Sequence, residues 1–420
     1  MIRTRPWRIR LRCAAPLPLQ LFGLAVLLAA LPLGCSEDET PLGFDEGPRG
    51  PAVQLPETLL VSPPVADVGW RPDFRTGAAL RIFAGKDEEM KARALVRFGS
   101  IPDTTGARRA YVRFYAEQGR GDTLSLAARQ VTSAWNADDV TAAAPPETTT
   151  AVDPLGVVTG VPTGSIPINV HVPLSDIEIP LSLIREWKSD PASNNGLQIS
   201  RISGTGIAAL VSHNDLIYDE NGVRILTPLL VLEIGETPVL RSALATEDAY
   251  IVEDLRPPIA GDDSTAAIGA GNIQRFLLRF DISAVPENAS IARSTLALYL
   301  TSGILSENTP IQPAVNPVRE SWQEPGPGEE APDSLLLGSA VTTATFEGTE
   351  DGWLFLEVGG LVQAWTTGLE NDGLSVRVVG ETSSAKEIYV ATSEATVPEH
   401  RPRLTIVYVR PPEPRWKEAP

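Results

Sequence analysis

The chain has 420 residues and a formal net charge of −18. Its length exceeds what one hydrophobic core usually organises, so two domains are expected. The acidic excess argues against nucleic acid as a partner, because phosphate binding needs a basic surface. The 37 Pro and 34 Gly separate short apolar runs, a pattern typical of an all-β protein.

Residues 1–34 have the pattern of an export signal. Five Arg and no acid precede the apolar run Leu21–Leu33, which is too short to span a bilayer. The sequence "LPLGC" follows and resembles a bacterial lipoprotein signal, although Pro32 stands where that family has a small or aliphatic residue. The resemblance implies lipidation of Cys35, and Cys13, in the removed segment, would leave it no disulfide partner. An ordinary secretory signal with an incidental cysteine is the alternative.

A lipid on Cys35 would anchor the protein to a membrane of the bacterial cell envelope, at the outer membrane or the cell surface. Residues 35–56 are acidic and rich in Pro and Gly. Such a segment buries too little apolar area to offset the entropy of ordering, so it is expected to be a flexible tether. At the other end, residues 411–420 form a tail after the last expected strand.

Most of the remaining chain consists of two similar copies. "RALVRF" from Arg93 and "RFLLRF" from Arg275 open stretches whose landmarks recur in the same order. These landmarks are Pro102 and Tyr115 with Pro286 and Tyr299, Trp135 with Trp322, Trp187 with Trp365, Gly196 with Gly373, and the strands from Thr227 and Arg401. The openings "VADVGW" and "EDAYIV" also match loosely. We therefore expect two domains with independent cores, at residues 57–235 and 238–410.

The order R-x-L-L-R-F-D-I-S, A-x-L-x-L-Y, L-V-Q-A-W-x-x-G, N-D-G-L and R-P-x-L-x-I-x-Y resembles the DNRLRE domain family of secreted microbial proteins. The similarity is stronger in the second copy, because the first has "GSIP" in place of "DISAVP" and longer insertions. The resemblance implies tandem jelly-roll β-sandwiches. It also implies glycan binding, since some members are classed as carbohydrate-binding modules.

Alternation along the strands separates a core face from an outer face. The expected core residues are Ala94, Val96, Phe98, Val112 and Phe114 in the first copy, and Phe276, Leu278, Phe280, Leu296 and Leu298 in the second. The expected outer residues, and candidate glycan-binding residues, are Arg93, Arg97, Tyr111, Arg113 and Tyr115 in the first copy, and Arg275, Arg279 and Tyr299 in the second.

If the two strands of a copy pair, these residues share one surface. Tyr rings stack on sugars and Arg binds carboxylates through two parallel bonds, so an acidic polysaccharide would suit the surface. The first copy has more of these residues and is expected to be the stronger binder. The alternative is structural: Arg pairs with acids across the strands, and Tyr is a good strand former.

Helical spacing predicts one short helix in each copy. Leu183, Ile184 and Trp187 share a face in the first copy, and Leu361, Val362 and Trp365 share one in the second. Both tryptophans are expected in the core.

Two acidic loops, Ala260–Gly269 and Trp135–Asp139, offer the oxygen ligands that calcium prefers, but without the spacing of a calcium loop. Solvated turns are the favoured interpretation, and no other cofactor is expected. His171, His213 and His400 lie far apart, and no catalytic motif is present. We therefore expect a lipid-anchored, non-catalytic glycan-binding protein. A structural or adhesive module that binds another protein is the alternative, and a polysaccharide-degrading enzyme with paired carboxylates is the minority view.

Overall fold

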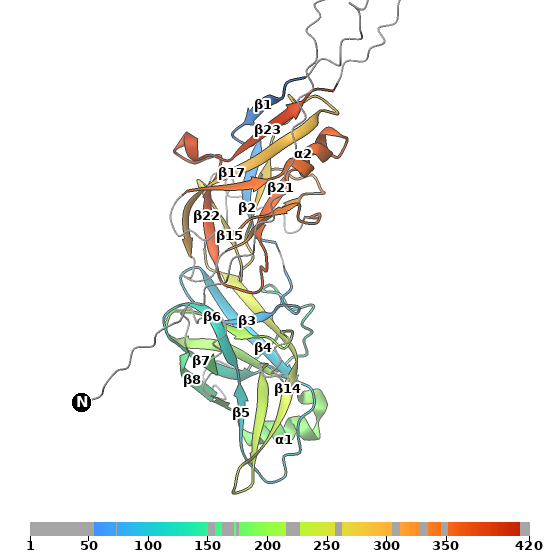
Figure 1. Ribbon diagram of the computed structural model, residues 1–420. Coiled ribbons are helices and arrows are strands. Elements are labelled where there is room, and N and C mark those ends of the chain that lie inside the picture. Colours follow the sequence, from blue (N-terminus) through green and yellow to red (C-terminus); the bar gives the residue numbers. More distant parts are fainter. Residues whose placement is uncertain are drawn as a thin grey trace, which may run out of the picture. The chain divides into compact units, whose positions relative to one another are not determined.

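The computed structural model describes residues 54–72, 74–149, 156–161, 172–173, 176–215, 227–256, 263–304, 311–326, 335–345 and 352–411. The expected signal, Cys35, most of the expected tether and most of the expected tail lie outside these ranges. The described part contains 23 strands and two α-helices, and every strand pair is antiparallel (Figure 1). The expected all-β, sandwich-type fold is confirmed.

The first sandwich contains twelve strands. They are β3 (Arg81–Lys86), β4 (Met90–Phe98), β5 (Ala107–Arg113), β6 (Tyr115–Gly121), β7 (Leu124–Gln130), β8 (Gly156–Val161), β9 (Val172–Pro173), β10 (Ile177–Glu178), β11 (Leu197–Ser203), β12 (Gly206–Val211), β13 (Leu229–Ile234) and β14 (Val239–Asp254). The long strand β14 pairs with β13 through its first half and with β4 through its second half.

The second sandwich contains eleven strands. They are β1 (Glu57–Val61), β2 (Ala66–Trp70), β15 (Thr265–Gly269), β16 (Arg275–Arg279), β17 (Ser290–Ile304), β18 (Pro313–Pro317), β19 (Thr342–Thr343), β20 (Gly352–Glu357), β21 (Leu374–Val378), β22 (Glu387–Ala391) and β23 (Arg403–Val409). One sheet has the order β1-β23-β17-β22-β15, with β20 also on β17, and the other has the order β19-β18-β21-β16-β2.

The two copies have exchanged their first strands. By sequence β1 and β2 open the first copy, yet β1 pairs with β23 and β2 pairs with β16 of the second sandwich. By sequence β14 opens the second copy, yet it completes the first sandwich through β13 and β4. The registers are equivalent: Asp67 lies opposite Leu278 in one sandwich, and Asp248 lies opposite Val96 in the other.

The boundary expected between residues 235 and 238 therefore does not separate the sandwiches of the structure. The described residues between 54 and 411 form one compact unit. In sequence "VADVGW" and "EDAYIV" match only loosely, and both sandwiches offer such segments the same strand edges. Sequence similarity alone thus leaves open which sandwich each segment completes.

The predicted core residues are buried. The first core contains Ala94, Val96, Phe98, Val112 and Phe114, and the second contains Phe276, Leu278, Phe280, Leu296 and Leu298. The opposite face of the repeated strand, however, is also covered. Leu95 packs with Trp135 in a small second core, and Leu277 does the same with Trp322. Alternation predicted correctly on which side of the strand each residue lies. It did not predict that a loop covers the outer side.

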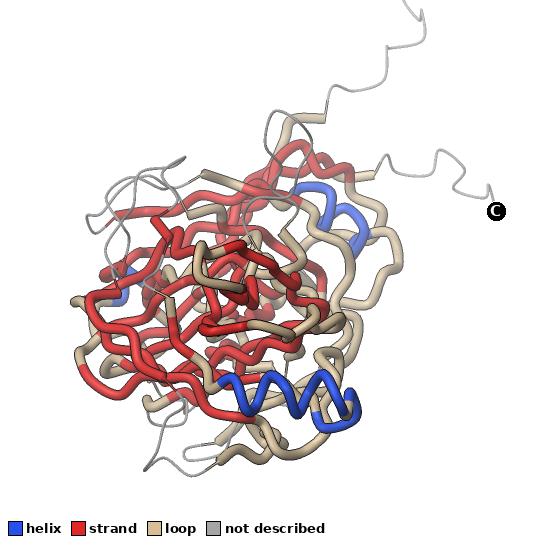
Figure 2. The backbone as a smooth tube through the Cα atoms, turned by 90° about the horizontal axis from the view of Figure 1, so that it is seen from below, coloured by secondary structure: helices blue, strands red, loops and turns tan. Residues whose placement is uncertain are grey.

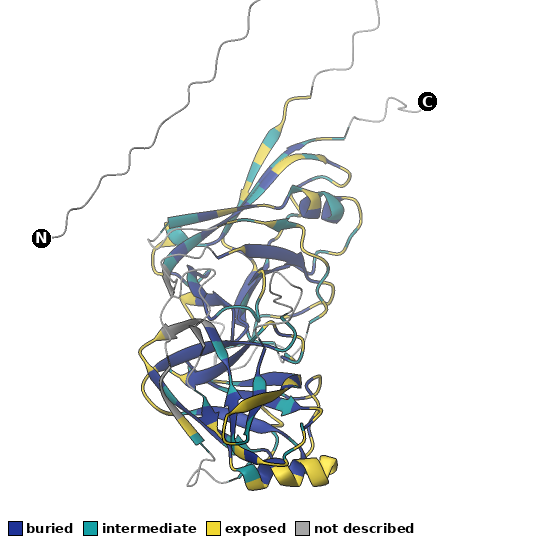
Figure 3. Cartoon of the chain, turned by 60° about the horizontal axis from the view of Figure 1, so that its bottom comes forward, coloured by how far each residue is buried: buried dark blue, intermediate teal, exposed yellow. Residues whose placement is uncertain are grey.

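The predicted helices are α1 (Leu181–Ser189) and α2 (Gly359–Thr366), which lie beside the strands in Figure 2. Their inward residues, Leu183, Ile184 and Trp187 in α1 and Leu361, Val362 and Trp365 in α2, are all buried as predicted. In Figure 3 the other face of α1 is exposed. Two short 3-10 helices, η1 (Pro191–Ser193) and η2 (Pro398–His400), complete the helical structure of the described residues.

Candidate functional site

The Arg and Tyr residues predicted in the first copy do not share one surface. Their common surface depended on pairing between β4 and β5, but β13 and β14 lie between these strands in the sheet order. Arg93 and Arg97 on β4 are thus separated from Tyr111 and Arg113 on β5. Tyr115, which begins β6, pairs with β9.

Internal partners already hold the side chains of this set on β5. Arg113 binds both carboxylate oxygens of Asp176, at 2.8 and 2.9 Å. The Tyr111 ring lies between the guanidinium groups of Arg109 and Arg113, at 4.9 and 5.4 Å from its centre. Tyr111 is only 2% exposed, and burial raises its pKa. A ring in this position has no face open to a sugar, while Tyr115 is half-buried.

The second Arg of each opening motif braces a tryptophan loop. Arg97 donates to the backbone oxygen of Trp135 at 3.2 Å, covers its ring at 5.3 Å and pairs with Glu247. Arg279 donates to the backbone oxygen of Trp322 at 2.9 Å and covers its ring at 5.5 Å. This contact explains why both copies contain the same residue at this point of the motif.

The first Arg of each motif is half-buried. Arg275 binds both carboxylate oxygens of Glu381, at 2.6 and 2.8 Å, and covers the ring of Trp70 at 5.1 Å. Arg93 is half-buried on β4. The structural alternative, in which arginines pair with acids, therefore describes Arg97, Arg113 and Arg275.

Tyr299 has different surroundings, which we call the aromatic face. It consists of Tyr299 on β17, Trp353 and Phe355 on β20, Arg403 on β23 and His400 of η2. The Tyr299 and Trp353 rings meet edge to face with centres 5.3 Å apart, and Trp353 and Phe355 lie 6.3 Å apart at 26°. Phe355 is 58% exposed. The result is a group of neighbouring rings on the outer face of a sheet.

A guanidinium and an imidazole pack against the rings of the aromatic face. The Arg403 guanidinium lies 3.8 Å from the centre of the Trp353 ring, and the His400 ring stacks on Tyr299 at 3.6 Å. Among the described residues, Arg403 forms no ion pair with a carboxylate. Next to the face, Arg293 is paired with Glu357 at 2.6 Å. Arg403 is therefore the arginine of this face that remains available to an acidic ligand.

The same position in the first sandwich is charged instead of aromatic. Ile177 lies opposite Val112, and Leu356 lies opposite Leu296, so Asp176 corresponds to Phe355. In the same alignment Arg113 corresponds to Ala297. The first copy thus contains an ion pair where the second has a small residue beneath an exposed ring. Sequence analysis missed Trp353 and Phe355, although the alternation in "GWLFLE" was a signal that both point to one side.

Three carboxylates converge elsewhere in the second sandwich. Oxygens of Asp67, Glu324 and Glu394 lie within 4.8 Å of one another. Asp67 is buried and accepts hydrogen bonds from the backbone N–H and the hydroxyl of Ser393. Burial raises the pKa of Asp67 to about 7. Of the described residues, these three have the oxygen chemistry that a calcium ion would require.

The acidic loops named from the sequence do not form this cluster. Asp138 and Asp139 are exposed, and Asp139 lies 3.7 Å from Arg75. Asp262 lies outside the described residues. In their described residues, 135–139 and 263–269, these loops have no arrangement that favours calcium over a solvated turn.

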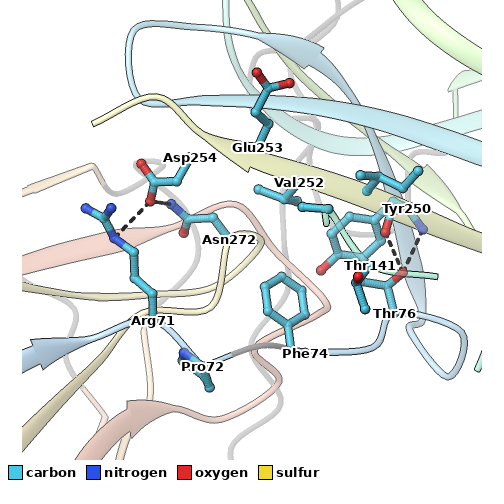
Figure 4. Close-up of a pocket in the computed structure, with 12 residues that line it drawn as sticks. Arg71, Pro72, Phe74, Thr76, Thr141, Tyr250, Val252, Glu253, Asp254 and Asn272 are labelled. Atoms are coloured by element: carbon cyan, nitrogen blue, oxygen red, sulfur yellow. Dashed lines mark hydrogen bonds and ion pairs between the residues drawn. The ribbon is translucent and has the colours of Figure 1, made fainter. Parts of the chain in front are cut away.

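A cavity of about 310 Å³ lies at the junction of the sandwiches (Figure 4). Phe74 and Tyr250 supply aromatic walls, and Arg71, Asp254 and Asn272 supply a polar wall. Asp254 pairs with Arg71 at 3.2 Å and with Arg256 at 2.8 Å. Arg71 follows β2 and Arg256 follows β14. Asp254 therefore links the two segments that follow the exchanged strands.

The histidines are not arranged for catalysis in the described structure. The Nδ1 atom of His213 lies 2.9 Å from Asp248. The hydroxyl of Ser212 donates its hydrogen bond to Asp248 and not to the imidazole, so it is not placed as a nucleophile activated by His213. The second sandwich repeats this carboxylate contact between Asp67 and Ser393, which indicates a structural role. His400 stacks on Tyr299, and His171 lies outside the described residues.

Comparison with known proteins adds no family: no protein-family model matches the chain, and no curated protein matches it. The similarity to DNRLRE domains therefore depends on the motif residues alone. None of the described helices has the length and hydrophobicity needed to cross a membrane.

Proposed function

We propose that this protein is a non-catalytic glycan-binding lipoprotein of the bacterial cell envelope, anchored through Cys35, and that it binds glycans at the aromatic face. The neighbouring rings of the half-buried Trp353 and the exposed Phe355 are the observation that supports this proposal. Aromatic rings pack against the apolar faces of sugars, and a sheet surface holds such rings in fixed positions. The DNRLRE-like motifs point to the same function.

The charges around the face favour an acidic glycan. Arg403 can bind a uronic-acid carboxylate or a sulfate through two parallel hydrogen bonds, since no described carboxylate occupies it. The acidic protein as a whole repels such a polymer at long range. Affinity must then come from local stacking and the Arg403 contact, so it should be modest and should decrease with salt.

This proposal moves the binding surface from the first copy to the second. Tyr111 is enclosed between two arginines, and Arg113 is engaged by Asp176. At the position that corresponds to Asp176, the second copy has the exposed Phe355. The two copies therefore do not offer two equal sites on the chain.

Affinity electrophoresis on alginate, pectin and a neutral glucan tests the proposal. We expect alginate or pectin to retard the wild-type protein more than the glucan does. Phe355→Ala should reduce the retardation several-fold, and Arg403→Gln should reduce it on the acidic gels. Leu336→Ala is the matched control, because Leu336 is 59% exposed and lies outside the face.

Two results would count against the proposal. If no gel retards the wild type, the aromatic face is better assigned to a protein partner, since exposed apolar patches also bind proteins. If Phe355→Ala migrates like the wild type on gels that retard both, the protein binds glycans through another surface.

A further inference from the structure

Residues Glu57–Trp70, which we call the donor segment, carry β1 and β2 and belong to the second sandwich by all their strand pairs. β1 pairs with β23 over five residues, and β2 pairs with β16 over five residues. Both strands lie at the edges of their sheets. The segment can therefore leave without breaking another described strand pair.

Side chains fix the donor segment to the same sandwich. Val68 and Trp70 are buried with Leu277 and Trp322. Glu57 binds Arg410 at 2.5 and 2.9 Å. These contacts, like the strand pairs, specify one register and one acceptor.

The acceptor does not require the donor to come from its own copy. Strand β14, the equivalent of the donor segment, occupies the same position in the first sandwich and comes from the second copy. Each sandwich is thus completed by a segment that belongs, by sequence, to the other copy. Strand register determines the partner, and covalent order does not.

We propose that the second sandwich also accepts the donor segment of a second copy of this chain, so that two or more chains link by strand exchange. The exchanged segment would make the contacts it now makes within one chain, and no new interface is needed. The connection after Trp70 changes its path, and the Arg71–Asp254 ion pair at 3.2 Å holds that connection in the intramolecular arrangement. This inference does not depend on the proposed glycan binding.

Cysteine cross-linking of the full chain tests the exchange. Leu60 and Thr405 lie opposite each other in register, Leu60 is 57% exposed and Thr405 is half-buried. In a chain with Cys13 and Cys35 replaced by Ser, Leu60→Cys and Thr405→Cys are made separately. The two variants are unfolded, mixed, refolded over a range of concentrations and oxidised. We expect a disulfide-linked heterodimer whose yield rises with protein concentration.

Three controls make the outcome decisive. The chain with both cysteines should form an intramolecular disulfide at low concentration, which confirms folding in register. Leu240→Cys, at an equally exposed position on β14, should yield little heterodimer with Thr405→Cys. Arg71→Ser removes the ion pair with Asp254 and should raise the heterodimer yield several-fold. If the double variant closes on itself at every concentration while the mixture yields no more than the Leu240→Cys control, the proposal is wrong.

Discussion

The two sandwiches bury an aspartate at the same position but bind it differently. Asp248 accepts hydrogen bonds from the hydroxyl of Ser212 and from the backbone N–H of His213, and the His213 ring lies 2.9 Å from it. Asp67 is held by Ser393 and lies beside Glu324 and Glu394, which add like charge. Burial is the largest cause of its raised pKa, about 7. Asp67 is therefore a titratable residue within the donor segment.

This residue should make stability depend on pH in an unusual direction. The pKa of Asp67 rises from 3.8 when unfolded to about 7 when folded, so the folded protein holds this proton more tightly. Its contribution to stability is fully present below about pH 4 and is lost as the pH rises to 7. At about 1.4 kcal/mol per pKa unit, the loss amounts to a few kcal/mol. Asp67→Asn should remove this pH dependence of the stability.

Urea unfolding of the wild type and of Asp67→Asn at pH 5 and pH 8 measures this effect. The variant should be the more stable protein at pH 8, and its advantage should shrink at pH 5. Asp281→Asn is the control, because a hydrogen bond from the backbone of Ser283 lowers the pKa of Asp281 and gives the opposite trend. An equal stability difference at both pH values would show that Asp67 does not keep its proton.

At the scale of single elements, the repeated strand shows what its motif does. Arg97 and Arg279 occupy the same position and hold Trp135 and Trp322 over the outer face of β4 and β16. The indole N–H groups are also satisfied, by Asn195 at 2.7 Å and by Asp372 at 2.8 Å. The motif thus closes a second small core in each sandwich.

Arg97→Ala should destabilise the protein by roughly 2–4 kcal/mol. The change removes a hydrogen bond to the Trp135 loop and leaves the largely buried Glu247 without its cation. Thermal melts would be compared with those of Arg293→Ala, whose solvent-exposed ion pair with Glu357 should contribute little to stability. Similar losses in both variants would contradict the bracing role.

Local patterns predicted the elements well and their partners poorly. The two-residue period identified Val96 and Leu278 as core residues, and helical spacing identified Trp187 and Trp365. The same period placed Leu95 and Tyr111 outside, but a loop covers one and two arginines enclose the other. Burial of an outer face depends on which distant segment packs there, and a single sequence does not specify this. Phe355 was missed for the same reason.

At the scale of the whole molecule, strand exchange makes the sandwiches depend on each other. The sequence repeat would divide the chain near Glu236, but a fragment of residues 236–410 lacks β1 and β2. Its β23 and β16 edges and the apolar surface around Leu277 would be exposed, while β14 would lack its partners β13 and β4. Such a fragment should aggregate or unfold, because unpaired edges and open apolar patches are unfavourable.

A division that follows strand pairing should behave differently. Residues 54–70 joined through a Gly/Ser linker to residues 256–411 contain every described strand of the second sandwich, and residues 71–255 contain every described strand of the first. We expect both proteins to unfold cooperatively in urea, whereas the 236–410 fragment should not. The ion pair between Asp254 and Arg256, at 2.8 Å, and the hydrogen bond from Tyr389 to Glu89, at 2.7 Å, are lost on separation. Each unit should therefore be less stable than the intact chain. A cooperative 236–410 fragment beside an unfolded rearranged one would show that the second copy completes itself without the donor segment.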